Sequence, residues 1–170
     1  MTNAEPILTD IDMKDGGIDL SNNKDLVNAV IPVHIYGNPC NFDSVREFSE
    51  EQDIPIVEDA CQAHGAEYKG KKVGSLGNVG CFSFYPTKQI TTGEGGMLIC
   101  NDRNFYLKVK KLKAFGIDSD IKDRKKPGLY DVKSLGFNYR MTDFQAAIGY
   151  HALKKYPQEL MKRKENAKLY

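Results

Sequence analysis

The sequence lacks several features that would mark particular classes of protein. Its 170 residues contain no apolar run near the ~18 residues of a membrane span, and no signal-peptide apolar region. Neither sign of charge dominates, with 24 basic against 23 acidic residues, so no nucleic-acid or membrane partner is indicated. Cys-x-x-Cys spacing is absent and no metal site is indicated. We therefore expect a soluble cytoplasmic protein with four reduced thiols, Cys40, Cys61, Cys81 and Cys100.

What is present is an alternation of short apolar runs and amphipathic stretches, typical of an α/β fold. Strands are predicted at 29–34, 54–57, 79–85 and 97–100, and helices at 42–52, 103–115, 143–155 and 157–170. Pro32 argues for an edge position or an irregularity in the first strand. Asn41 is a plausible N-cap for the first helix, and Gly116 fits the position just after the second.

Apolar spacing also predicts which helix residues are buried. Tyr68 to Gly74 should form a hairpin turn, and the polar stretch 117–135, broken by Pro127-Gly128, is expected to be a mobile loop. The residues expected on inner helix faces are Phe42, Val45 and Phe48 in the first helix, Phe105, Val109 and Leu112 in the second, and Ala146, Ala147 and Ile148 in the third.

Two residues suggest a chemistry from their placement. Asp59 and Lys88 each follow an apolar run, and strand ends of this kind face the ligand crevice of an open α/β sheet. An amine can form a Schiff base with pyridoxal phosphate, while an acid pairs with the ring nitrogen. Spacing alone leaves an alternative open, because an Asp after a strand is often a cap or turn former and a Lys there is usually solvated.

The surrounding motifs narrow the choice. Glu58-Asp-Ala-Cys-Gln-Ala-His-Gly-Ala66, Gly74-Ser-Leu-Gly77, Cys81-Phe-Ser-Phe-Tyr-Pro-Thr-Lys88 and Thr91-Thr-Gly-Glu-Gly-Gly96 closely resemble the DegT/DnrJ/EryC1/StrS family of sugar aminotransferases. The resemblance runs from about Pro6 to the C-terminus with the motifs in the same order. It implies a partial large domain of a fold-type-I, pyridoxal-phosphate-dependent transferase, with a mostly parallel sheet and flanking helices.

The resemblance also implies roles for individual residues. Lys88 would be the Schiff-base lysine and Asp59 the partner of the ring nitrogen. Further cofactor contacts would come from Cys61 on one ring face, Gln62 near the phenolic oxygen, Ser83 at the phosphate and Asn138 across a dimer interface. Substrate contacts are expected from His34, Tyr36, His64 and Arg140, although a core His34, a surface Gln62 or His64 and a loop Asn138 are the plainer alternatives.

Family members are much longer, so the resemblance implies a fragment cut at both ends. Residues 1–116 would belong to the cofactor-binding domain, 117–135 to the loop, and 136–170 to dimer or interdomain helices that lead to a missing C-terminal domain. An upstream segment that grips the cofactor phosphate would also be missing. We therefore expect the isolated chain to be poorly stable and inactive.

The implied reaction moves an amino group from glutamate or glutamine to a keto group of a nucleotide-linked sugar, in a homodimer that serves surface-polysaccharide or antibiotic-sugar synthesis. Thr91-Thr-Gly-Glu-Gly-Gly96 slightly favours 4-keto over 3-keto sugars. Two alternatives stay open. One is a same-fold sugar dehydratase, against which Lys88 argues because a His replaces the lysine there. The other is a catalytically silent fragment that acts only in binding or assembly.

Overall fold

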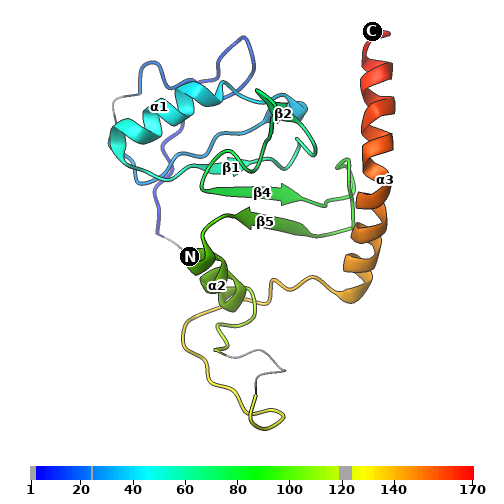
Figure 1. The fold of residues 1–170 in the computed structure, drawn as a ribbon. Helices are drawn as coiled ribbons and strands as arrows, with labels where there is room; N and C mark the ends of the chain where they lie inside the picture. Colours follow the sequence, from blue (N-terminus) through cyan, green and yellow to red (C-terminus); the bar gives the residue numbers. More distant parts are fainter. Residues whose placement is uncertain (1–2, 24, 119–123) are drawn as a thin grey trace.

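The structure, a computed structural model, describes residues 3–23, 25–118 and 124–170. Its centre is a sheet in the order β1 (Val57–Asp59), β4 (Val79–Ser83) and β5 (Gly96–Cys100), shown in Figure 1. β1 and β4 run parallel, whereas β5 runs antiparallel to β4, so the sheet is mixed. The predicted α/β class is confirmed.

A further extended segment lies beside β1, around Pro32. Two parallel bridges join it to β1 and the residue before it, Val30 with Ile56 and Val33 with Asp59. The predicted strand is thereby reduced to isolated bridges, because proline has no N–H with which to continue the ladder. This agrees with the irregularity expected from Pro32.

Helix α1 (Phe42–Gln52) lies on the β1 side of the sheet, above β1 in Figure 1. The core between them contains Val30, Cys40, Phe42, Val45, Phe48 and Ile56, which include the whole predicted apolar stripe of the helix. Asn41 precedes the helix as predicted, but its side chain does not cap it. The Asn41 Oδ1 instead accepts a hydrogen bond from the Tyr68 hydroxyl at 3.3 Å. The short 3₁₀ turn η1 (Ile35–Gly37) leads into this region.

Between β1 and β4 the chain forms the predicted hairpin, with β2 (Glu67–Tyr68) antiparallel to β3 (Lys71–Lys72). Lys69 and Gly70 form its turn with φ of 48° and 81°. Both lie in the left-handed region, which glycine adopts without strain. The hairpin returns the chain to the start of β4.

Helix α2 (Arg103–Leu112) follows β5 and is capped by Asp102, whose Oδ1 accepts two backbone N–H groups of the first turn. The helix ends at Leu112 with Lys113 as its C-cap, three residues before its predicted end, so Gly116 is not the residue directly after the cap. Gly116 does have a positive φ, of 73°. The predicted inner face is wrong: Phe105 is exposed, while Val109 and Leu112 are only half-buried. An apolar stripe shows which face can be covered, but it does not supply the covering segment.

The predicted loop 117–135 is partly described. Residues 119–123 lie outside the described residues. On either side of them, Ile117 bridges Val132, and the Asp118 N–H donates to the Asp131 carbonyl at 3.0 Å. The flanks of this loop are therefore paired with each other.

Helix α3 (Asp143–Ala167) is one continuous helix, so the predicted break at Pro157 is wrong. Thr142 and Gln145 cap it reciprocally, each side chain accepting the other residue's backbone N–H. A proline inside a helix costs about 3 kcal/mol. Packing on both sides of the proline opposes that cost, because Tyr156 and Leu160 lie against Gly65.

The predicted burial along α3 is also wrong, since Ala146, Ala147 and Ile148 are exposed. The helix instead contacts the described chain at a few points, such as Gln145 Nε2, which donates to the Glu94 carbonyl at 2.7 Å. Within residues 3–23, 25–118 and 124–170, none of the helices has both the length and the apolar character needed to cross a bilayer.

Candidate active site at the carboxyl ends of β1 and β4

Because β1 and β4 are parallel neighbours, their carboxyl ends lie at the same edge of the sheet. Asp59 is the last residue of β1, which begins later than the predicted strand 54–57. Lys88 lies in the turn after β4, where its backbone N–H donates to the Tyr85 carbonyl at 3.0 Å. The prediction that Asp59 and Lys88 follow neighbouring strands is thus confirmed.

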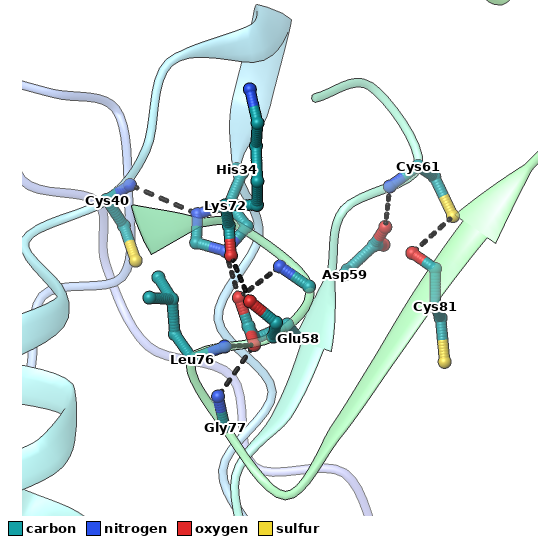
Figure 2. Close-up of polar contacts among 11 residues, drawn as sticks. His34, Cys40, Glu58, Asp59, Cys61, Lys72, Leu76, Gly77 and Cys81 are labelled. Atoms are coloured by element: carbon teal, nitrogen blue, oxygen red, sulfur yellow. Dashed lines mark hydrogen bonds and ion pairs between the residues drawn. The ribbon is translucent and has the colours of Figure 1, made fainter. Parts of the chain in front are cut away.

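Cys61 lies close enough to Asp59 and Lys88 for both side chains to affect the pKa of its thiol. Its N–H donates to the Asp59 Oδ1 at 3.0 Å, and its thiol donates to the Cys81 carbonyl at 3.7 Å (Figure 2). Burial raises the pKa of the Cys61 thiol to about 12; the Asp59 carboxylate adds to that rise and the Lys88 ammonium opposes it. Cys61 is therefore a neutral, half-buried group beside two charges of opposite sign.

An open pocket of about 380 Å³ lies at this edge, lined by Tyr36, Gln62, Thr87, Lys88 and Gln89. This volume is within the range of small-molecule sites. Tyr36 and Gln62 were predicted as site residues, whereas Thr87 and Gln89 were not, although each adjoins Lys88 in the sequence.

Gln62 and Tyr36 are joined where they line the pocket. The Gln62 Oε1 accepts the Tyr36 backbone N–H at 2.9 Å. The Gln62 amide NH₂ is then the part of this side chain that can donate to a ligand. Tyr36 has φ of 55°, a strained conformation that clusters at functional sites, and its side chain is 88% exposed.

His64 is buried and is not among the residues that line the pocket. Its Nδ1 lies 2.9 Å from the Gln89 Oε1. Burial lowers the pKa of the imidazole. His64 therefore contacts a pocket residue rather than the pocket itself.

His34 was expected to face the site, and this is wrong. The side chain is fully buried, its Nε2 lies 3.0 Å from the Glu58 Oε2, and its Nδ1 accepts the Cys40 N–H at 3.3 Å (Figure 2). Since Nδ1 is an acceptor, the Nε2 carries the proton that bonds to Glu58. With both ring nitrogens occupied, His34 is a core residue.

Glu58 was not singled out from the sequence, yet several of the hydrogen bonds drawn in Figure 2 meet at its carboxylate. Its carboxylate is buried and accepts the N–H groups of Gly74, Leu76 and Gly77 at 2.6 to 2.7 Å. Burial alone would raise the pKa of Glu58, but the bonds from His34 and these amides outweigh it and lower the pKa. An acid inside a short strand was the available sequence signal, because an unpaired charge there would be costly.

The sequence that forms this site is similar to that of known proteins. All 170 residues match the DegT/DnrJ/EryC1/StrS aminotransferase family. The chain belongs to this family.

Similar proteins include the GDP-perosamine synthase of Caulobacter vibrioides, 39% identical over 94% of this chain and 42% of that protein. A UDP-4-amino-4,6-dideoxy-N-acetyl-beta-L-altrosamine transaminase of Campylobacter jejuni is 39% identical over 94% and 43%. The crystal structure of an aminotransferase from Psychrobacter cryohalolentis has a TM-score of 0.88 at 36% identity, over 97% of this chain and 44% of that one. The chain thus spans less than half the length of these relatives.

DegT/DnrJ/EryC1/StrS aminotransferases depend on pyridoxal phosphate, and their structural similarity to this chain confirms a partial fold-type-I domain. The residues at the sheet edge suit that group. The pocket presents the Lys88 amine and the Gln62 amide, and the Asp59 carboxylate lies at the neighbouring strand end. A lysine amine and a carboxylate for the ring nitrogen are two of the protein groups that bind this cofactor.

The other residues predicted for this family's site are dispersed. Ser83 ends β4, and its Oγ accepts the Tyr85 N–H at 3.3 Å. Asn138 is exposed beside the end of α2, where it bridges Ala114. The Arg140 Nε donates to the Asn138 Oδ1 at 3.0 Å. Neither Asn138 nor Arg140 is among the residues that line the pocket.

Proposed function

We propose that the complete protein containing this chain is a pyridoxal-phosphate-dependent sugar aminotransferase. It would move an amino group from glutamate or glutamine to a keto group of a nucleotide-linked sugar. The observation that carries the proposal is the placement of Lys88 in a pocket at the sheet edge where Asp59 ends β1. The names of the Caulobacter and Campylobacter relatives support the sugar as acceptor.

Each site residue has a role that its surroundings favour. The Lys88 Nζ would hold the cofactor and then move the proton to and from the amino carbon of the substrate. Bound pyridoxal phosphate supplies a ring that stabilises negative charge at that carbon. Asp59 offers a carboxylate to the ring nitrogen, and Gln62 an N–H donor to the phenolic oxygen. Cys61 would lie beside the ring.

The rest of the proposal follows from the family. The hydroxyl of Ser83 would donate to the cofactor phosphate, and Asn138 would reach the phosphate of the second subunit in a homodimer. Tyr36 is the exposed aromatic ring at the pocket, so it is available to the sugar nucleotide. We retain 4-keto sugars as the favoured acceptors, with surface-polysaccharide or antibiotic-sugar synthesis as the setting.

The decisive test concerns Lys88. Lys88→Arg keeps the positive charge but cannot form the covalent link, so transamination should fall by several orders of magnitude. Borohydride reduction followed by peptide mapping should place the cofactor on Lys88 in the wild-type protein and nowhere in the variant. Lys108→Arg on exposed α2 is the matched control and should leave both results unchanged.

This experiment also separates the alternatives. A Lys88→Arg protein that still transaminates would reject the assignment. A complete wild-type protein that takes up no cofactor would favour the silent binding or assembly module. A sugar dehydratase of this fold would have a His in place of Lys88, so the lysine itself argues against that reaction.

A further inference from the structure

A chain of hydrogen bonds joins the turn that carries Lys88 to the loop that follows Asp59. The Gln89 Nε2 donates to the Gln62 carbonyl at 2.8 Å, and the Gln89 Oε1 lies 2.9 Å from the His64 Nδ1. Gln89 directly follows Lys88, whereas Gln62 and His64 lie three and five residues after Asp59. One side chain thus bridges the two segments that hold the proposed catalytic groups.

The chemistry of the partners determines which atoms of this bridge donate and which accept hydrogen bonds. A carbonyl can only accept, so the Gln89 NH₂ must face the Gln62 carbonyl and the Gln89 oxygen must face His64. The His64 Nδ1 therefore donates. His64 is only 6% exposed, which suits a neutral imidazole with one defined tautomer. Replacing Gln89 by any apolar residue would leave two buried or half-buried polar groups without this partner.

His64 is itself fixed from other directions. The Tyr156 hydroxyl of α3 donates to the His64 carbonyl at 2.5 Å. The His64 ring packs against Phe82 and Phe84, with ring centroids 5.6 and 5.9 Å away. Gln89 is therefore anchored to a rigid group rather than to a mobile surface residue.

We propose that Gln89, held between His64 and the Gln62 carbonyl, is a positioning residue that sets the reach of Lys88 toward the reacting carbon. The inference rests on the proposed function. Lys88 has a long side chain, so the setting of its backbone turn decides where its amine can reach. A misplacement of about 1 Å can cost on the order of a hundredfold in rate.

The test measures the half-reaction of the complete, cofactor-loaded protein with L-glutamate and with L-glutamine. The loss of the visible absorbance band of the cofactor is the signal that is monitored. Gln89→Met keeps the length of the side chain but removes both hydrogen bonds. The saturating rate should fall about tenfold or more, while the half-saturating concentration stays within about twofold. The pH midpoint of the cofactor band should shift as well. Gln158→Met, the same change on the exposed surface of α3, should match the wild type.

His64→Phe retains the aromatic packing and removes both ring nitrogens. Of these only the Nδ1 bonds to Gln89, while the buried Nε2 has no hydrogen-bond partner among the described residues, so the variant should lower the same rate through loss of the Nδ1 donor. Because both residues act through one bridge, the double variant should lose less than the product of the two single losses. If Gln89→Met does not fold, His64→Phe decides alone through the rate and the pH midpoint.

The inference is overturned if Gln89→Met behaves like Gln158→Met, if only its half-saturating concentration changes, or if the two losses multiply. A purely structural role would lower the melting temperature and leave the pH midpoint unchanged, which also overturns it. Peptide mapping distinguishes failure of the proposed function, because a wild-type protein without cofactor on Lys88 overturns both.

Discussion

At the scale of single residues, the buried carboxylate of Glu58 shows how a charge can organise a sheet. Adjacent strand residues point to opposite faces, so Glu58 and Asp59 serve different partners. Glu58 accepts three backbone N–H groups and the His34 Nε2–H in the core, whereas Asp59 bonds to the Cys61 N–H near the pocket. The first residue fixes the strand that presents the second.

Glu58→Gln should destabilise the protein by about 3 kcal/mol near neutral pH, because an amide cannot accept all four hydrogen bonds. The native pKa of Glu58 lies below its ordinary value of 4.5. Its contribution is therefore complete above that value and is lost as the pH falls through the native pKa.

Urea unfolding near neutral pH and at about pH 4 or below checks this prediction. The difference in unfolding free energy between wild type and Glu58→Gln should shrink in acid. Glu159→Gln, an exposed change of the same kind on α3, should change stability by less than about 0.5 kcal/mol. A gap that is constant with pH would contradict the assigned charge state.

At the scale of elements, the sequence predicts well those units whose partners are also local. The stripe of α1 is buried as predicted, because nearby segments of the chain supply Val30, Cys40 and Ile56 as its packing partners. Asp59 and Lys88 were located because strand ends converge wherever strands are parallel. The antiparallel direction of β5 was not predicted, since an apolar run is the same in either direction.

The predictions that failed share one physical cause, which is that each feature depends on contacts with residues distant in the sequence. Pro157 was read as a helix start, but tertiary contacts of Tyr156 and Leu160 with Gly65 oppose its local cost. His34 looked available because a strand end is often open, and only Glu58 and Cys40 show that it is not. The bridge through Gln89 likewise depends on residues 25 and 27 positions away.

The contact of α3 with the site loop gives a prediction at this scale. Tyr156→Phe removes the hydroxyl that donates to the His64 carbonyl and leaves the ring packing in place. The protein should lose about 1 kcal/mol of unfolding free energy, measured by urea unfolding. Tyr150→Phe, at an exposed position of the same helix, is the control and should have little effect. Equal losses in the two variants would show that the buried bond contributes nothing.

At the scale of the whole molecule, much apolar surface is uncovered. In Figure 1, α3 extends past the sheet along most of its length. The exposed apolar side chains from Leu135 onward include Leu135, Phe137, Tyr139, Phe144, Ile148, Tyr150, Leu153 and Met161. So many exposed apolar side chains in one part of the chain favour association with another segment or subunit. Asn138 lies in the same part of the chain.

If Asn138 serves the neighbouring subunit, the complete protein should show complementation between two inactive variants. Lys88→Ala disables the site of its own subunit, whereas Asn138→Ala disables the site of its partner. A mixed dimer then combines a native Lys88 with a native Asn138 in one of its two sites. Random mixing should restore about a quarter of the wild-type sites, because about half of the dimers are mixed.

The measurement is transamination after the two purified variants are unfolded together and refolded, compared with each variant refolded alone. The control mixes Lys88→Ala with Asp59→Asn, because both residues are proposed for the site of their own subunit. If that is correct, no dimer in this mixture contains a complete site. In that control a mixed dimer has one defect in each site, so activity should stay at the level of the separate variants. No recovery with Asn138→Ala would place Asn138 in its own subunit's site. Recovery in the control would show instead that Lys88 and Asp59 do not serve the same subunit's site.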